Sequence, residues 1–374
     1  MKDNLAELLL AKVMGWEEDD VTSERPDLQA IGAYKFDEYQ QFSPGMRFIE
    51  SLAIWLRQFK TINERRIAYH FVKNRMIFIS GAEMAHLVIT AYPDLIRPII
   101  LKKAAIAARI PEYMLTKITQ STPFKALRRQ SLFLGLSDGA HTDTFRRSNT
   151  SEVKHEQVYQ TYEISDKRAD DMVSELKSDL QKLLEGKPQQ EEVRFKIVFL
   201  LDDFAGSGIT YLRREKDGFG GKIARLYAEA TNPESPLTKL FDITQTTVYL
   251  VLYSSTLQAI TYLRNLIPEL WDKSYPIPEI VAVHQLSKDS CLSPEKDSEI
   301  LELCKNDSYY DAENLEDKHT KQGGKDVRNG FGDCRLPLVL SHNTPNNSLA
   351  LLWAYEDASF RGLFPRVPRH KEFI

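Results

Sequence analysis

The spacing of hydrophobic and polar positions changes near residue 130 of this chain. Before that point, apolar residues recur every three or four positions, which is the spacing of one helix face. Residues 43–59 follow this pattern, and Ser43 is the expected cap, with Pro44 at the first helical position. The spacing predicts that the first third of the chain is helical.

Capping residues predict where the next helices begin and end. Asn63 is the expected cap of a helix that carries Ile67 and Phe71. Ser80 and Glu83 have the spacing of a capping box, and Pro93 is expected to close the helix that they start. Residues 96–110 are apolar with a basic interruption, which predicts one more helix.

After residue 130, short apolar runs alternate with amphipathic stretches. The amphipathic stretch that Ser165 caps is expected to end at Gly186. The apolar runs are predicted to be strands over 131–137, 195–203, 246–255, 278–286 and 335–341. This alternation predicts an α/β fold with a Rossmann-like, mostly parallel sheet covered by helices on both faces.

The change of pattern suggests a division of the chain into two parts. We expect a helical N-terminal region over residues 1–125 and an α/β domain over 126–374. Residues 287–333 are polar with little periodicity, and we expect a long loop or insert there.

Composition narrows the classes of protein that fit. The net charge of -4 gives no argument for a general nucleic-acid coat or a polybasic membrane binder. Three cysteines without a C-x-x-C pair argue against a disulfide framework and a structural zinc site. The short apolar run near the N-terminus is expected to be a helix and not a signal peptide, and no apolar run is expected to span a bilayer. A soluble, cytoplasmic protein is therefore expected, and oligomerisation remains open.

The stretch VFLLDDFAGSGIT, residues 198–210, carries the most specific chemistry. Four apolar residues predict a central strand, and Asp202 and Asp203 follow where that strand is expected to leave the sheet. A turn of small residues at the start of a helix exposes consecutive amides that bind phosphate, and carboxylates bind sugar hydroxyls. The expected phosphate-binding residues are Ala205, Gly206, Ser207, Gly208, Ile209 and Thr210. The stretch therefore predicts a receptor for a ribose 5-phosphate.

Other interpretations of this stretch fit less well. The chain has no G-x-x-x-x-G-K-[ST] string for a P-loop, and a Rossmann fingerprint would place its glycines before any acid. The strand and its terminal aspartate could form a Walker-B motif, but the chain has no P-loop to accompany it. The remaining alternative is an ordinary strand followed by a solvated acidic pair and a glycine turn.

Two further segments end strands in small or polar residues. In parallel sheets the carboxyl ends of the strands share one edge, so we expect both segments to join Asp202 and Asp203 there. The first is SDGAH, residues 137–141, and the second is HNTPNNS, residues 342–348, which is expected to form a polar helix start for an anion or a base edge. The expected binding residues in the second segment are Asn343, Thr344, Asn346 and Asn347.

The order of apolar residues, two acids and a small-residue loop closing on Thr resembles the phosphoribosyl-diphosphate signature of type I phosphoribosyltransferases. The resemblance implies that Asp202 and Asp203 hold the ribose 2′ and 3′ hydroxyls and that residues 205–210 hold the 5′-phosphate. That family more often has Thr where Ser207 stands. The resemblance also implies that residues 137–140 occupy the position of the pyrophosphate-binding loop that follows the first strand in that family. The expected ligand contacts there are Ser137, Asp138 and Gly139, followed by Arg146 and Arg147.

A broader resemblance extends over about residues 130–374. The segments FLGLSDGAHTDTFRRSN, DDFAGSGIT, GFGDCRLPLVLSHNTPNNSLALLW and LFPRVPRH are similar to the PRTase-CE family, phosphoribosyltransferase-like proteins of bacterial conflict systems. This resemblance implies a sheet of the type I phosphoribosyltransferase kind. It also implies an effector of a retron-type anti-phage system, with a reverse transcriptase–msDNA complex or a second protein as a partner.

Three hypotheses about function remain open. The first is an enzyme that binds phosphoribosyl diphosphate or a related nucleotide and transfers or cleaves at ribose C1, with Mg²⁺ held through the ligand and no direct protein metal site. The second is a catalytically silent nucleotide sensor that regulates a partner. The third is a toxin-like effector that a partner keeps inactive, and it is compatible with either of the first two.

Overall fold

The computed structural model describes residues 3–184, 188–189 and 192–367. The chain divides into two compact units. Unit 1 combines residues 1–83 with residues 287–374, and unit 2 comprises residues 84–286. This division does not coincide with the expected boundary at residue 125, because the C-terminal segment shares a hydrophobic core with the N-terminal helices.

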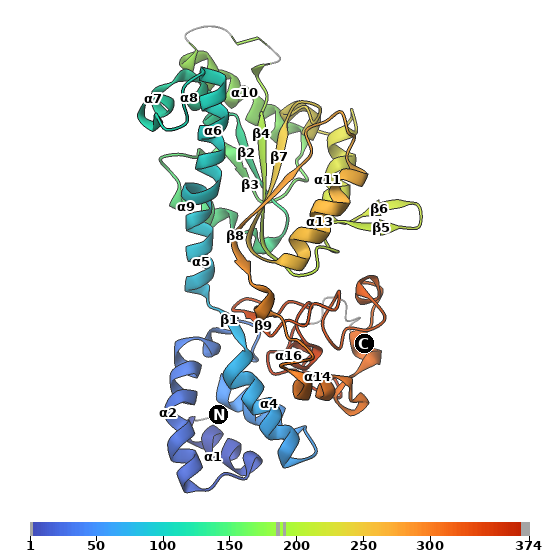
Figure 1. The fold of residues 1–374 in the computed structure, drawn as a ribbon. Helices are drawn as coiled ribbons and strands as arrows, with labels where there is room; N and C mark the ends of the chain where they lie inside the picture. Colours follow the sequence, from blue (N-terminus) through green and yellow to red (C-terminus); the bar gives the residue numbers. More distant parts are fainter. Residues whose placement is uncertain (1–2, 185–187, 190–191, 368–374) are drawn as a thin grey trace. The chain divides into compact units, whose positions relative to one another are not determined.

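Unit 2 contains a five-stranded parallel sheet with the order β3-β2-β4-β7-β8 (Figure 1). The predicted α/β fold class is confirmed. Strands β4 and β7 form the centre, and their register pairs Asp202 with Leu252 and Ala205 with Ser255. The strands are β2 (Ser131–Gly135), β3 (Val158–Tyr159), β4 (Ile197–Ala205), β7 (Thr247–Thr256) and β8 (Glu279–Leu286).

Helices cover both faces of this sheet. Alternate strand residues such as Leu200 and Leu250 enter a core with α10, α11, α12 and α13. On the opposite face, Phe133, Phe199 and Tyr249 stack across three strands with ring centroids 5.3 Å apart at each step. Cross-strand aromatic pairs of this kind stabilise the register that places the strand ends at one edge.

The remaining elements of unit 2 are mostly helical. The first part contains η2 (Ala91–Ile96), α6 (Arg97–Ala108), α7 (Leu115–Gln120), α8 (Thr122–Arg129), η3 (Asp138–Ala140), α9 (Thr142–Ser148), η4 (His155–Gln157) and α10 (Asp166–Leu183). The second part contains the hairpin strands β5 (Arg213–Glu215) and β6 (Gly218–Gly220), then α11 (Lys222–Thr231), α12 (Leu237–Leu240) and α13 (Leu257–Leu270).

Unit 1 is helical apart from a two-stranded parallel sheet of β1 and β9. Its N-terminal elements are α1 (Asp3–Met14), α2 (Glu18–Tyr34), η1 (Phe36–Glu38), α3 (Phe48–Arg57), α4 (Ile62–Arg75) and β1 (Ile77–Ile79). Its C-terminal elements are η6 (Lys288–Ser290), α14 (Ser298–Lys305), η7 (Asp307–Tyr309), α15 (Ala312–Leu315), η8 (Thr320–Gly323), β9 (Leu338–Leu340) and α16 (Ala350–Trp353). Helix α5 (Gly81–Thr90) runs across the division between the units.

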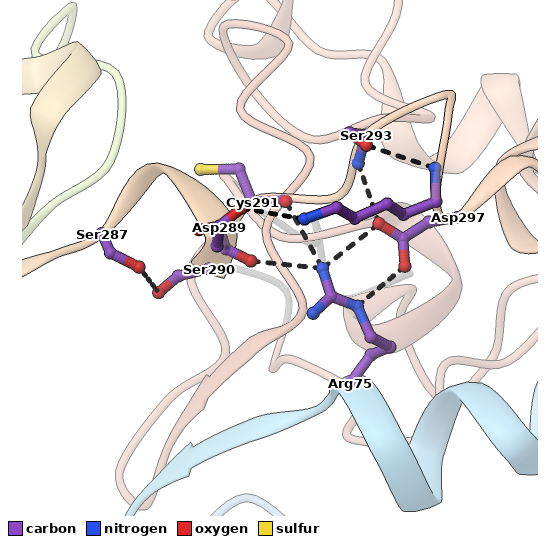
Figure 2. A network of polar contacts seen from close by, with 8 residues as sticks. Arg75, Ser287, Asp289, Ser290, Cys291, Ser293 and Asp297 are labelled. Carbon is purple, nitrogen blue, oxygen red and sulfur yellow. Dashed lines mark hydrogen bonds and ion pairs between the residues drawn. The ribbon is translucent and has the colours of Figure 1, made fainter.

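The polar segment 287–333 contains short helices and is not a structureless loop. Ile300, Cys304 and Tyr309 are buried in the core of unit 1. Figure 2 shows how Arg75, at the end of α4, holds the start of this segment. Its guanidinium donates to both Asp297 oxygens, at 2.7 and 3.2 Å, and to the Asp289 carbonyl at 3.2 Å. A charged residue that binds backbone carbonyls can thus order a segment with few apolar residues.

The expected helix ends are confirmed at some positions and wrong at others. Ser80 and Glu83 form the reciprocal capping box, and the Ser165 hydroxyl accepts from the Arg168 amide. Gly186 lies outside the described residues. The other three expectations, at Ser43 with Pro44, at Asn63 and at Pro93, are wrong.

The corrections have local causes. Residues 43–46 form a turn, and α3 begins only at Phe48. Thr61, two residues before Asn63, forms the capping box of α4 with Glu64. Pro93 does not close its helix, because the backbone widens into the π-helical segment η2 and continues as α6.

One helical segment, Gly81–Ala108, has the length and composition of a bilayer-crossing helix. This finding qualifies the expectation that no apolar run could span a membrane. Within its most apolar window, 39% is buried inside the fold, and the buried core helices of soluble proteins pass the same test.

Candidate functional site at the carboxyl edge of the sheet

Asp202 lies at the centre of a buried polar cluster. Its side chain is fully buried on β4, and the Ser137 hydroxyl donates to its Oδ1 atom. Its Oδ2 atom accepts from the Tyr211 hydroxyl at 2.7 Å and from the Lys222 ammonium at 2.5 Å. Side chains that are 65, 9 and 20 residues away along the chain therefore meet at one carboxylate.

Burial and charge act in opposite directions on this cluster. Burial raises the pKa of Asp202, and the nearby Lys222 charge opposes that rise without cancelling it. Burial and the Asp202 charge together raise the pKa of Tyr211 well above its usual range. Tyr211 therefore remains a hydroxyl donor at any physiological pH.

Asp203 points to the opposite face of the sheet, because successive strand residues alternate. A Cβ atom added to Gly139 would meet an Asp203 carboxylate oxygen at 2.5 Å, so a larger residue there would displace the Asp203 side chain. The Tyr253 hydroxyl donates to the Ala140 carbonyl at 2.7 Å and holds the same turn against the strand. Asp203 is partly exposed, whereas Asp202 is fully buried.

The two acids therefore lie inside β4 and not after it. The strand runs on to Ala205, because the neighbouring strand β7 is long enough to pair with it as far as Ser255. The expectation that both acids lie where the strand leaves the sheet is wrong, because β4 continues past them to Ala205.

The small-residue turn after β4 is mostly buried. Gly208 has a φ of 82°, and a Cβ atom there would meet Tyr262 at 2.8 Å. The Thr256 hydroxyl donates to the Gly206 carbonyl at 2.5 Å, and the buried Ser207 hydroxyl accepts from the Ile209 amide.

Only the end of this turn, at Ile209 and Thr210, reaches the surface. The expected helix does not follow directly, because the β5–β6 hairpin intervenes before α11. The expectation of a helix N-terminus behind the turn is wrong for this reason. An anion could approach the turn through its exposed end.

The predicted residues of the 137–147 segment divide into two groups. Ser137 and Gly139 contact the two acids, as described above, and Asp138 is exposed beside them. Arg146 and Arg147 instead pair with Asp143 on α9, at 2.6 and 2.9 Å. Both of these ion pairs lie within α9 itself.

The segment after β9 does not join this edge. Strand β9 pairs with β1 in unit 1, so the expectation that all three loops share one sheet edge is wrong. Helix α16 starts only at Ala350, so this segment is a turn and not a helix start.

The predicted residues of this turn make internal contacts. The Asn347 amide donates to the Phe331 carbonyl at 2.9 Å, and the buried Thr344 hydroxyl contacts Tyr39 and the Phe364 carbonyl, each at 3.0 Å. Asn343 accepts from Gln41 at 3.2 Å, and the Asn346 carbonyl accepts from the Phe331 amide at 2.7 Å.

Lys222 and Tyr211 were missed as site residues by sequence reasoning. Lys222 belongs to a basic stretch that has the composition of a solvated helix face, yet its side chain is only 17% exposed. The sequence feature that could have identified Lys222 is the preceding Gly221. In the structure Gly221 has a φ of 109° and comes directly before the first residue of α11, which is Lys222.

Two hydroxyls at the end of β7 belong to the same edge. Ser254 and Ser255 are fully buried beside Phe204 and Ala205, and neither hydroxyl has a hydrogen-bond partner within the described ranges. A buried hydroxyl without a hydrogen-bond partner lowers the stability of the fold. A ligand group that reached Ser254 or Ser255 and bonded its hydroxyl would therefore be bound more favourably.

Metal ligands do not gather in the part of the chain that the structure describes: no group of three or more His, Cys, Asp or Glu side chains could hold an ion there. One partly exposed carboxylate, Asp203, suits Mg²⁺, which keeps several waters and binds phosphates of its ligand.

Comparison with known proteins gives a family match. No significant match was found among curated proteins or among solved structures. A family model described as PRTase-CE matches residues 52–366, which is most of the chain. On this match, together with the α/β sheet and the N-terminal helices, the chain belongs to the PRTase-CE family, as its sequence resemblance predicted.

Proposed function

We propose that the carboxyl edge of the sheet binds phosphoribosyl diphosphate, or a related ribose 5-phosphate nucleotide, and promotes transfer or cleavage at ribose C1. The observation that carries this proposal is the meeting of Ser137, the two acids of β4 and Lys222 beside the turn 206–210. The family name, which denotes a phosphoribosyltransferase-like protein, supports the same class of ligand.

The two acids have different roles in this proposal. Asp203 is partly exposed and accepts hydrogen bonds from the ribose diol. Asp202 is a positioning residue, because both of its oxygens are already bonded within the protein. It holds the Lys222 ammonium at the edge, where that charge can face a phosphate.

Positioning and charge neutralisation are the chemistry that this edge can supply. The bond between C1 and the pyrophosphate oxygen breaks, positive charge develops on the ribose, and an acceptor or water takes the C1 position. Lys222 would stabilise the departing charge, and the exposed end of the turn would hold the 5′-phosphate. When Mg²⁺ is bound with the ligand, it supplies further neutralisation of the phosphates, and Asp203 is the residue that would contact it.

A nucleotide sensor without turnover is the second candidate. The fully bonded Asp202 favours it, because a site in which this acid is committed to the fold can bind a ribose phosphate without the paired grip that we expected from the sequence. In this version, ligand binding regulates a partner.

The biological setting follows from the resemblance alone. We propose a cytoplasmic effector of a bacterial anti-phage system of the retron type, possessing toxin-like activity that a reverse transcriptase–msDNA complex or a second protein restrains. Co-purification from cells with nucleic acid or with a second protein is expected, and isolation of the chain alone would count against this setting.

Calorimetry with phosphoribosyl diphosphate and Mg²⁺ tests ligand binding, and pyrophosphate release tests turnover. Asp203→Asn is expected to weaken binding by about tenfold or more, which corresponds to about 1.4 kcal/mol. Asp272→Asn is the matched control, because this exposed acid of the same unit accepts from Ser274 of its own turn and contacts none of the expected ligand-binding residues among those that the structure describes.

Each outcome separates the candidates. Release by the wild type that Asp203→Asn abolishes supports the enzyme, and binding without release supports the sensor. No heat at millimolar ligand, or equal losses in both variants, would contradict the ribose-phosphate site.

A further inference from the structure

Helices α6, α7 and α8 of unit 2 form a contiguous cluster with an unusual charge balance (Figure 1). Residues 97–130, which contain these helices, include eight Lys and Arg residues and a single acid, Glu112. The whole chain has a net charge of -4, so positive charge is concentrated in this segment. Such segregation indicates an anionic partner.

Four of these cations are exposed and unneutralised. Lys102, Arg109, Lys117 and Lys125 are exposed, and none of them forms an ion pair within residues 3–184, 188–189 and 192–367. Two other basic residues of the segment are paired, Arg128 with Glu152 and Arg129 with Asp179, and these two contribute less free charge. The free cations are distributed over all three helices of the cluster.

Large apolar side chains are exposed among these cations. Tyr113 is 79% exposed, Ile106 is 68% exposed and Leu115 is 53% exposed. Lys102 and Ile106 are four residues apart, which places them on one face of α6, and Arg109 is the C-cap residue of the same helix. A surface that alternates cations with a flat aromatic ring matches the phosphates and bases of a nucleic acid.

We propose that the α6–α8 cluster binds single-stranded nucleic acid, independently of the ribose-phosphate site. The cations bind backbone phosphates, and Tyr113 stacks on a base. A single strand is favoured over a duplex, because an exposed ring needs an unstacked base. A nucleic acid is favoured over an anionic membrane, because Ile100, Leu101 and Ala104 of α6 are buried and cannot enter a bilayer while the fold persists, which leaves Ile106 as the one large apolar side chain that this helix exposes.

Fluorescence anisotropy of the full chain with a labelled oligodeoxythymidine of about 20 nucleotides tests the proposal, since known site sizes reach about 16 nucleotides. Binding is expected to weaken steeply with salt, with a logarithmic slope near -0.7 for each phosphate contact. The double variant Lys102→Glu/Arg109→Glu is expected to weaken binding by about tenfold or more and to make the slope shallower by about 1.4. Tyr113→Ala is expected to weaken binding without changing the slope.

The control variant is Lys167→Glu/Lys177→Glu on α10, where both lysines are exposed on an acidic helix of the same unit. It makes the same change in net charge and is expected to leave binding unchanged. If Lys102→Glu/Arg109→Glu fails to fold by circular dichroism, then Lys117→Glu/Lys125→Glu tests the same surface on α7 and α8. Absence of binding at low salt, equal losses in the control, or binding only to phosphatidylglycerol vesicles would overturn the proposal.

Discussion

The segments 202–210 and 341–348 look alike in sequence but differ in the structure. In each segment, polar and small residues come directly after a run of buried apolar residues in a strand. In the first segment, Asp202 is contacted by side chains from three separate places in the chain. In the second, the polar groups bond mainly to backbone carbonyls, as Ser348 does to Leu338 and Asn347 to Phe331.

This difference shows what makes a polar strand end a candidate site. A side chain whose donor satisfies a buried backbone carbonyl completes the fold and has less bonding capacity left for a ligand. A cluster of ionisable side chains that the fold keeps buried together indicates a functional site, because residues with perturbed pKa values concentrate at such sites. The first segment has such a cluster, and the second contains the fully buried and fully bonded Thr344.

The largest expected effect comes from breaking the ion pair of the first segment. Lys222→Met leaves the Asp202 carboxylate buried without its counter-charge, and we expect a loss of about 3 kcal/mol in the free energy of unfolding. Chemical denaturation measures this loss. Lys305→Met is the control, because its pair with Glu302 lies on the surface and its removal should have little effect. Equal, small losses in both variants would show that the Asp202–Lys222 pair is not desolvated.

A smaller effect is expected in the second segment. Thr344→Val removes a buried hydroxyl from the Phe364 carbonyl and the Tyr39 hydroxyl, which should cost about 1–2 kcal/mol in stability. Binding of phosphoribosyl diphosphate should not change, and calorimetry on the folded variant checks this. Thr22→Val in α2 is the control, because that hydroxyl is exposed and water can replace its partner. A loss of ligand binding in Thr344→Val alone would place the second segment back in the site.

The smallest expected effect is a pH dependence with opposite signs at two carboxylates. The pKa of Asp202 is raised in the folded state, chiefly by burial, so its contribution to stability is present below about pH 3.9 and is lost as the pH rises through the folded pKa. Burial also acts to raise the pKa of Asp179, but hydrogen bonds from Lys154 and Arg129 lower it overall. Its contribution is present above about pH 3.9 and is lost as the pH falls.

Denaturation of Asp202→Asn and Asp179→Asn between acidic and neutral pH measures both contributions. The wild type should lose stability relative to Asp202→Asn as the pH rises. It should lose stability relative to Asp179→Asn as the pH falls. The same sign for both variants would refute the assignment of burial as the dominant influence on Asp202.

Capping residues predicted the starts of helices correctly where no neighbouring residue competed for the cap. Ser165 and the Ser80–Glu83 pair start their helices as expected, because a cap needs only neighbours within four residues. The predictions at Asn63 and Ser43 are wrong. Thr61 caps α4 in place of Asn63, and the chain forms a turn at residues 43–46 before α3 begins. Near-equivalent caps differ by too little free energy for sequence alone to choose between them.

The order of apolar strands and amphipathic helices was sufficient to predict the α/β sheet and the meeting of residues 137–139 with Asp202 and Asp203. Three features depended on tertiary structure: the pairing of β9 with β1, the continuation of β4 to Ala205 and the approach of Lys222 to Asp202. Each depends on a partner that is remote along the chain. The free energy of strand pairing and of a buried ion pair comes from that partner, so the periodicity and caps of the segment itself carry no record of it.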